Sequence, residues 1–221
     1  MSIYRLHHAP AQWYSSLERY NPESELWWLD DNVKFIDELG CRTGVIGAYC
    51  QSQGIGWHGW ESNLSLVEQA ILRVGFDVTP KDFPPEGTAG FLLALFAPLA
   101  KVAPDAVADY AQTISKSLKP GGRALIELWW QEHDFEKEPV METYNGLVKW
   151  VRVRKPKVLC ASQVAVESHW LRANMNQQPQ RTVSSTLFYR HNHRRIIQAF
   201  AWGNPERVEY QGRTYLWLNK P

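Results

Sequence analysis

A short apolar strand that runs into a glycine turn, residues 33–44, limits the possible folds of this chain more than any other stretch. Phe35 and Ile36 favour an extended strand. Gly40 and Gly44 allow backbone angles or close approaches that a side chain would block. A helical pattern follows at once, so backbone N–H groups and a helix N-terminus lie at the carboxyl end of a strand. An open α/β sheet binds its ligand at this place, although an ordinary loop can also carry two glycines.

Length and charge limit the class of protein. A chain of 221 residues is long enough for one α/β domain with a sizeable core. The net charge of +1 and the 21% of charged residues give no sign of a polyanionic partner, so we expect no nucleic acid. The longest apolar run, 89–100, is too short to span a bilayer, and the first residues lack the apolar stretch of a signal peptide.

The three cysteines, Cys41, Cys50 and Cys160, match no metal-binding spacing and do not form an even set. They suit a reducing compartment and argue against a disulfide-stapled secreted protein. We therefore expect a cytoplasmic enzyme or binding domain without a metal site.

Strands and helices alternate from residue 33 to residue 129. Expected strands are 33–39, 55–61, 76–79 with an extension to 82–83, 90–96 and 123–129, and expected helices are 44–53, a segment from 62 or 63, and 105–118. The run 90–96 is apolar throughout, as in a strand buried on both faces. This order predicts an α/β fold with a doubly wound, mostly parallel sheet, which the closing hairpin described next extends to seven strands.

The pattern changes after residue 130. Residues 131–145 look irregular, and strands are expected at 147–154, 163–171 and 182–189, separated by Lys155-Pro156 and by 174–179. With no helix between them, these strands should pair as an antiparallel meander. A helix at 192–201 and a hairpin at 207–210 and 214–218 close the chain. We expect one domain, 1–221, with a helical cover at 1–32 and an antiparallel cap at 146–190.

In this order of elements and in four motifs the chain resembles the class I S-adenosylmethionine-dependent methyltransferases. The acid-x-Gly-x-Gly-x-Gly turn of that family corresponds to Glu38–Gly44, its acid after strand 2 to Glu61, and its acid after strand 3 to Asp82. The Lys-Pro-Gly-Gly turn before strand 5 is present unaltered at 119–122. The resemblance covers 33–129 well and 192–219 loosely.

The resemblance implies S-adenosylmethionine as the cofactor and gives each matching residue a role. Glu61 would accept hydrogen bonds from the ribose hydroxyls, and Glu38 would orient the ammonium of the methionine moiety. Asp82 would accept from the adenine amino group. The full set of expected cofactor residues is Glu38, Gly40, Arg42, Gly44, Glu61, Ser62, Asp82, Phe83, Leu95 and Phe96. The acids could instead satisfy local N–H groups or a helix dipole, and Leu95 and Phe96 could instead pack the core.

Arg42 is the departure from the family pattern, which has glycine at this position. Its side chain could crowd the cofactor, or it could point away and leave the turn intact. If Arg42 adopts a positive φ, the cost is of order 1 kcal/mol.

The antiparallel cap resembles that of family members that methylate small molecules, where it roofs the acceptor pocket and sometimes forms a homodimer contact. Methyl transfer is an in-line displacement that depends mainly on aligning the acceptor with the methyl group and on excluding water. An acceptor amine or hydroxyl can also need a base. His133 and Tyr14 are the first candidates, with Asp134, His169 and Tyr189 as others, and a structural role is the alternative for each.

Three functions remain open from the sequence. The first is a methyltransferase acting on a small-molecule acceptor at N or O, with no membrane partner. The second is a non-catalytic or repurposed member of the same fold, which Arg42 keeps in consideration. The third is a nicotinamide-dependent oxidoreductase. It ranks below the others because the glycine spacing is Gly-x-x-x-Gly rather than Gly-x-Gly-x-x-Gly.

Overall fold

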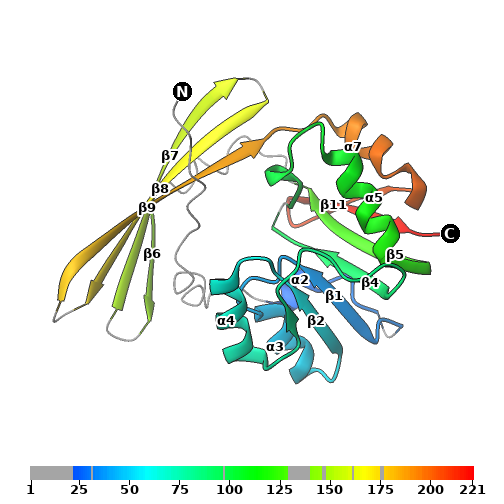
Figure 1. Ribbon diagram of the computed structural model, residues 1–221, viewed down its shortest axis with the longest axis horizontal. Coiled ribbons are helices and arrows are strands. Elements are labelled where there is room, and N and C mark those ends of the chain that lie inside the picture. The colour runs from blue at the N-terminus through cyan, green and yellow to red at the C-terminus, as the bar shows by residue number, and fades with distance from the viewer. Residues whose placement is uncertain are drawn as a thin grey trace. The chain divides into compact units, whose positions relative to one another are not determined.

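The computed structural model describes residues 22–30, 32–96, 98–128, 140–145, 148–160, 162–174 and 177–221 (Figure 1). They belong to two compact units. The larger unit comprises residues 20–129 and 191–221, and the smaller unit includes 130–190. The first candidates for a catalytic base, Tyr14 and His133, and the further candidate Asp134 lie outside the described residues.

The larger unit is built on a seven-stranded sheet. Its strands are β1 (Phe35–Leu39), β2 (Gly56–Trp60), β3 (Val78–Thr79), β4 (Ala89–Ala94), β5 (Leu118–Leu128), β10 (Glu206–Tyr210) and β11 (Arg213–Asn219). They lie in the order β10-β11-β5-β4-β1-β2-β3. β1 to β5 are parallel, whereas β11 runs antiparallel to both β5 and β10. The predicted doubly wound, mostly parallel sheet with a reversed closing hairpin is confirmed.

Helices connect these strands as the periodicity predicted. They are α2 (Pro22–Glu25), α3 (Val45–Ser52), α4 (Leu64–Val74), α5 (Val107–Ser117) and α7 (His193–Ala199), with 3-10 turns η1 (Pro98–Lys101) and η2 (Ala201–Gly203). Asn63 caps α4 by accepting a hydrogen bond from the Ser65 N–H at 3.1 Å. α3 packs against β2 and α4, and α5 packs against β5 and α7 (Figure 1). The core lies between these helices and β4, whose Leu92 and Leu93 are fully buried.

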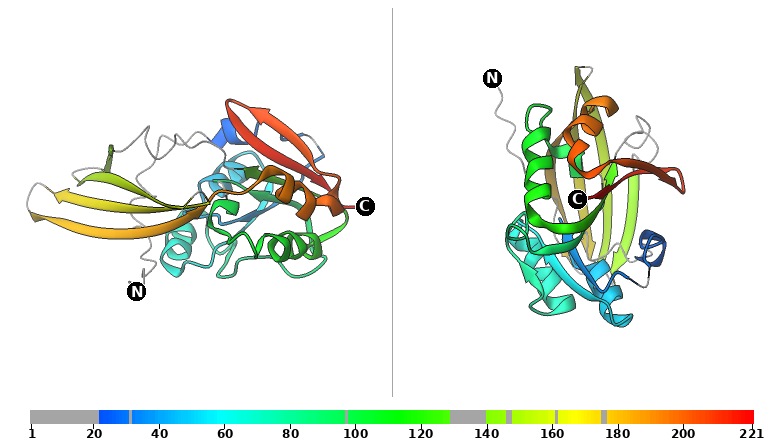
Figure 2. Two further views of the ribbon diagram at one scale, coloured as in Figure 1. Left: turned by 90° about the horizontal axis from the view of Figure 1, so that it is seen from above. Right: turned by 90° about the vertical axis from the view of Figure 1, so that its right-hand side faces the viewer.

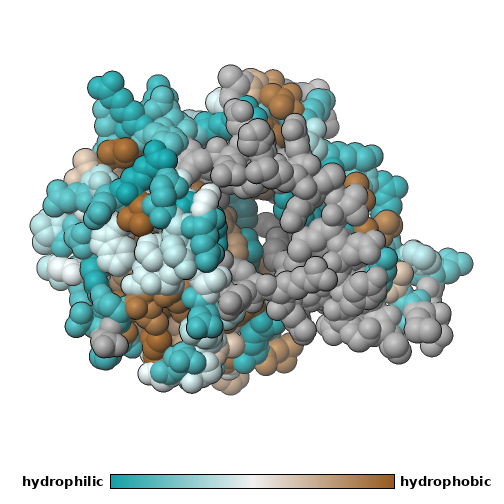
Figure 3. Space-filling view, turned by 180° about the vertical axis from the view of Figure 1, so that it is seen from behind, coloured by the Kyte–Doolittle hydropathy of each residue, from teal (hydrophilic) through white to brown (hydrophobic). Residues whose placement is uncertain are grey.

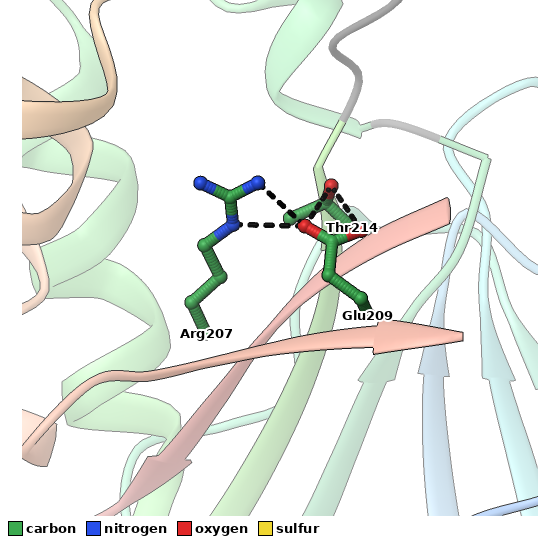
Figure 4. Close-up of polar contacts among 3 residues, drawn as sticks. All are labelled: Arg207, Glu209 and Thr214. Carbon is green, nitrogen blue, oxygen red and sulfur yellow. Dashed lines mark hydrogen bonds and ion pairs between the residues drawn. The ribbon is translucent and has the colours of Figure 1, made fainter. Parts of the chain in front are cut away.

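The closing hairpin carries an ion pair within β10 and a hydrogen bond that joins the same acid to β11. Glu209 and Thr214 are directly opposite in the register, and the Thr214 hydroxyl donates to the Glu209 carboxylate at 2.8 Å (Figure 4). Arg207 donates to the same carboxylate through Nε at 2.9 Å and through Nη2 at 2.6 Å. Because the pair is half-exposed, we expect it to add little to stability.

The smaller unit contains a separate four-stranded antiparallel sheet, with β7 to β9 running side by side (Figure 2). Its strands, in spatial order, are β6 (Val140–Asn145), β7 (Val148–Cys160), β8 (Gln163–Asn174) and β9 (Gln177–Tyr189). The predicted meander is confirmed, but two of its details were wrong. Residues 140–145 form β6 instead of an irregular segment, and Lys155-Pro156 continues β7 instead of ending it.

Pro156 is tolerated because of where it lies in the sheet. β6 pairs with β7 only as far as Val153, so beyond that point β7 pairs only with β8 among the described strands, and Pro156 faces Val166. A proline cannot donate to a strand neighbour, but on a side where no second strand is described beside it, no donor is required of it by the described strands. The turn predicted from Pro156 therefore fails for a reason that only the strand order reveals.

Two boundaries in the larger unit also differ from expectation. β3 ends at Thr79, so Asp82 and Phe83 follow it in bends. β5 begins at Leu118, so residues 119–122 lie within the strand instead of in a turn before it. The strand is irregular there, because Gly121 has φ 73° and its register with β4 shifts between Ala89 and Phe91.

On the face seen in Figure 3, small groups of hydrophobic residues lie between hydrophilic ones. The most exposed large apolar side chain described is Phe76, with 89% of its surface accessible. Within the described ranges, no helix has both the length and the apolar character needed to cross a membrane.

Candidate functional site

The candidate site lies where β1, β2 and β4 end. Glu38 is the penultimate residue of β1, Glu61 follows β2 directly, and Phe96 follows β4 by two residues. These three strands are adjacent and parallel. Their carboxyl ends therefore share one edge of the sheet, where an open α/β sheet binds its ligand.

Glu61 joins the glycine turn to the start of α4. The carboxylate, only 8% exposed, accepts the Arg42 N–H at 3.1 Å through Oε2 and the Asn63 N–H at 2.9 Å through Oε1. The turn is also held by a bond from the Gly40 N–H to the Trp60 carbonyl at 2.7 Å. A carboxylate has about four acceptor positions, so each oxygen of Glu61 retains capacity for a further donor.

Glu38 is a buried acid with a tryptophan partner. It is 2% exposed, and its Oε2 accepts from Trp57 Nε1 at 2.9 Å. Burial raises the pKa of Glu38 to about 8. The Trp57 hydrogen bond and the Arg42 charge oppose this rise, and the Glu61 charge adds to it. Because both neighbouring charges act on Glu38, the two predicted acids share one electrostatic environment.

The Trp57 indole fits beside Glu38 because two glycines make room for it. A Cβ at Gly47 of α3 would lie 2.7 Å from the indole, and a Cβ at Gly59 of β2 would lie 2.5 Å from it. Glu38 and Gly59 are paired in the register, so Trp57 lies on the same face as Glu38. On the opposite face, buried Asp37 accepts from Trp60 Nε1 at 2.9 Å.

Replacing Gly47 with alanine should displace Trp57 and break its hydrogen bond to Glu38. We expect a loss of about 1–3 kcal/mol in the free energy of unfolding, as for an overpacked core. Urea unfolding measures the loss. Gly90→Ala is the control, since its Cβ would meet only the end of the flexible Lys119 side chain, at 3.1 Å. A Gly47→Ala protein as stable as the Gly90→Ala protein would contradict the packing described here.

Arg42 bridges the glycine turn and the end of β4. Its guanidinium carbon lies 3.6 Å from the centroid of the Phe96 ring, a cation–π contact. Arg42 has φ 55° and Phe96 has φ 64°, so both adopt the left-handed conformation, at a cost of about 1–2 kcal/mol each. Arg42 therefore keeps the backbone path expected of a glycine, while its side chain lies against a predicted cofactor residue.

Phe96 is held in this conformation by a carboxylate that sequence reasoning did not single out. Its N–H donates to Oε2 of Glu127 at 2.5 Å, and Glu127 is 9% exposed. Arg213 of β11 binds the same carboxylate with two N–H groups, Nε to Oε1 at 2.9 Å and Nη2 to Oε2 at 2.5 Å. An acid within the apolar run of β5 was the available signal, because a buried charge needs a partner.

Tyr110, which the sequence analysis did not single out, lies beside the residues predicted to bind adenine, Asp82 and Phe83. The ring of Phe83 meets that of Tyr110 of α5 edge to face, at 5.3 Å between centroids. Burial raises the pKa of Tyr110, and the Asp82 charge raises it further, which places Asp82 near the phenol. Asp82 itself is exposed. The structure thus gathers Asp82, Phe83 and an unforeseen tyrosine.

Lys101 adds a further charge that interacts with Arg42 and Glu61. Its side chain is exposed, yet desolvation by surrounding protein lowers its pKa; the Arg42 charge lowers it as well, while the Glu61 charge raises it. Of the other predicted residues, Ser62 is exposed, and Leu95 is buried in the core. A Cβ at Gly44 would lie 3.3 Å from Val74, so this glycine allows the turn to approach α4.

The two candidates for a catalytic base in the smaller unit, His169 and Tyr189, take part in contacts within that unit. His169 is hydrogen-bonded to Glu167 through Nε2 and to Arg181 through Nδ1, so both ring nitrogens have partners. Tyr189 pairs with Gln163 in the sheet and is half-buried. Among the described residues, no group of three potential ligands could hold a metal ion.

Sheet order, reversed hairpin and the separate antiparallel sheet together define the fold of class I S-adenosylmethionine-dependent methyltransferases. The chain matches no family model and no curated protein sequence. Solved structures do match it over nearly its whole length at low sequence identity, which shows a shared fold.

One similar structure is the sugar N-methyltransferase KedS8 from Streptoalloteichus, at 16% identity, with a TM-score of 0.80 over 100% of this chain and 96% of that chain. Another is S-adenosylmethionine-bound CalS10 from Micromonospora echinaspora, an amino pentose methyltransferase of calicheamicin biosynthesis. It is 16% identical, with a TM-score of 0.74 over 98% of this chain and 99% of that chain. DesVI from Streptomyces venezuelae is also 16% identical, with a TM-score of 0.73 over 96% of this chain and 90% of that chain.

Proposed function

We propose that this protein is an S-adenosylmethionine-dependent methyltransferase that acts on a small-molecule acceptor at nitrogen or oxygen. The observation that carries the proposal is the pair of buried acids, Glu38 and Glu61, at the ends of adjacent parallel strands, where the Glu61 charge helps to raise the pKa of Glu38. The fold shared with a sugar N-methyltransferase and with an amino pentose methyltransferase supports a small, amine-bearing acceptor.

The residues of this site suit the proposed cofactor. Glu61 has acceptor positions left for ribose hydroxyls, and a Cβ at Gly40 would meet no atom of the described residues within 4 Å. Phe83, with Asp82 next to it, would hold the adenine by ring contact and by a hydrogen bond to its amino group. Buried Glu38 offers a carboxyl group to a cation, whose charge would favour its ionised form.

Bound S-adenosylmethionine would supply an electrophilic methyl group on its sulfonium sulfur. The protein's part is then to align the acceptor with that methyl group and to exclude water. Glu38 would hold the amino-acid end and Glu61 the ribose, which together fix the donor from two sides. His133 and Tyr14 remain our proposed residues for removing a proton from the acceptor.

A second function is favoured by Arg42. Its guanidinium already occupies the face of Phe96 and acts on the charge of Glu38. A cation in this place would compete with the cationic end of the cofactor. The alternative is therefore a repurposed member of the fold that binds the cofactor weakly or not at all.

Calorimetric titration of the purified protein with S-adenosylhomocysteine and with NADH tests these functions. We expect S-adenosylhomocysteine alone to bind, and radiolabelled methyl groups to pass from S-adenosylmethionine to a member of a panel of amines and phenols. Weak or absent binding of S-adenosylhomocysteine, or binding without transfer, would favour the repurposed protein, and binding of NADH alone would contradict both proposals.

An Arg42→Gly variant refines the same test. It restores the residue expected at a positive φ and removes the guanidinium from Phe96. If Arg42 blocks the cofactor, this variant should bind S-adenosylhomocysteine at least about tenfold more tightly than the unaltered protein, a factor that corresponds to about 1.4 kcal/mol. If Arg42 is compatible with the cofactor, the two proteins should bind with similar affinity.

A further inference from the structure

The hydrogen bond between Phe96 and Glu127 follows from the strand register. Ala94 of β4 pairs with Ile126 of β5, so Glu127 lies beside the segment through which the chain leaves β4. On the other side, Glu127 pairs with Tyr215 of β11. Arg213 is two residues from Tyr215, on the same face as Glu127, which explains its contact with the carboxylate.

Phe96 has a conformation that needs support. A bulky aromatic residue at φ 64° is a backbone outlier, and such outliers persist only where their surroundings enforce them. The Glu127 carboxylate supplies the enforcing contact by accepting the Phe96 N–H. Arg213 fixes the carboxylate with two parallel N–H bonds, the most directional geometry that an arginine can offer to an acid.

The conformation determines where the Phe96 ring lies. With Phe96 in this left-handed conformation, its ring meets Arg42 of the glycine turn. This contact joins the ends of β1 and β4, the part of the site where we place the methyl-bearing end of the cofactor. Any change in the Phe96 backbone would move this surface.

We propose that Glu127 and Arg213 are positioning residues of the cofactor site, which act by holding the Phe96 backbone in its left-handed conformation. The inference rests on the proposed function, since it concerns the same site. Neither residue needs to touch the cofactor. Their effect on cofactor binding depends on the hydrogen bond from the Phe96 N–H to Glu127. The effect should disappear when position 96 carries a residue that adopts a positive φ without support.

A double-mutant cycle between Glu127→Gln and Phe96→Gly tests this. Glycine adopts a positive φ without support, so it removes the need for the carboxylate. In the otherwise unaltered protein, Glu127→Gln should weaken S-adenosylhomocysteine binding by about tenfold, as for loss of a charge-assisted hydrogen-bond network. In the Phe96→Gly background, the same change should alter the dissociation constant by less than about twofold.

Two further variants complete the experiment. Arg213→Lys keeps the charge but loses the paired N–H geometry, so it should weaken binding by about threefold and serves if Glu127→Gln does not fold. Glu209→Gln is the matched control, because it breaks an Arg–Glu pair on the neighbouring hairpin strand without touching Phe96. It should leave the dissociation constant unchanged.

Each outcome has a defined meaning. If Glu127→Gln weakens binding equally in both backgrounds, or lowers the urea midpoint without changing binding, its role is structural and the inference is wrong. If the unaltered protein does not bind S-adenosylhomocysteine, the proposed function is wrong and the inference falls with it.

Discussion

Replacing Glu61 with alanine should weaken binding of S-adenosylhomocysteine by about 30- to 1,000-fold. Two hydrogen bonds to a charged carboxylate together contribute about 2–4 kcal/mol, which corresponds to this range. The change also removes the acceptor that holds the Arg42 N–H and the Asn63 N–H, so the glycine turn loses its tie to α4. Calorimetric titration near neutral pH measures the effect, with thermal unfolding to confirm that the variant is folded.

Glu68→Ala is the matched control, because Glu68 is an exposed acid of the neighbouring helix α4. It should bind as the unaltered protein does. Glu61→Gln should also be impaired, since both Glu61 oxygens accept N–H groups and an amide must turn its NH2 toward one of them. A Glu61→Ala protein that binds within about threefold of the unaltered protein would show that Glu61 does not hold the ribose.

The stability of the protein should decrease as the pH rises from about 5 to about 8, because of Glu38. Burial raises the pKa of Glu38 from 4.5 to about 8 in the folded protein, so within this window the folded state holds a proton that the unfolded state has lost. The contribution of Glu38 is complete below pH 4.5 and is lost as the pH rises towards 8. Each unit corresponds to about 1.4 kcal/mol, so the total should be about 3 kcal/mol between about pH 5.5 and pH 8.5.

Urea unfolding of the unaltered protein and of Glu38→Gln at several pH values isolates this effect. Glutamine keeps an acceptor for Trp57 Nε1 but does not titrate, so the difference between the two proteins should change with pH and level off above about pH 8. A constant difference from about pH 5 to pH 9 would mean that Glu38 is ionised throughout, which would contradict its buried environment.

Most of the fold could be predicted because local patterns determine it. Alternating apolar strands and amphipathic helices between residues 33 and 129 predicted the sheet, and the expected helix start at 62 or 63 agrees with the Asn63 cap of α4. The errors arose where pairing overrides local preference. β6 is a strand because β7 lies beside it, and Pro156 stays within a strand because, among the described strands, only β8 pairs with that part of β7.

The site was predictable only in part, for a similar reason. Glu38 and Glu61 follow from the rule that ligands bind at strand ends, and the structure brings them into one electrostatic environment. The Glu127–Arg213 pair depends on register between residues 86 positions apart, which no local pattern encodes. Gly47 could have signalled a large neighbour, but only the packed structure identifies that neighbour as Trp57.

The left-handed conformation of Arg42 shows that this loop can keep its backbone shape without the glycine that usually stands at this position. The main chain follows the path that glycine normally allows, and the strain is met by a hydrogen bond to Glu61 and a stacked ring. Such a loop can therefore have another residue in place of its middle glycine and still follow the same backbone path. Searches that require the glycine would discard proteins of this kind, whereas a search for an acid at the ends of two successive parallel strands would keep them.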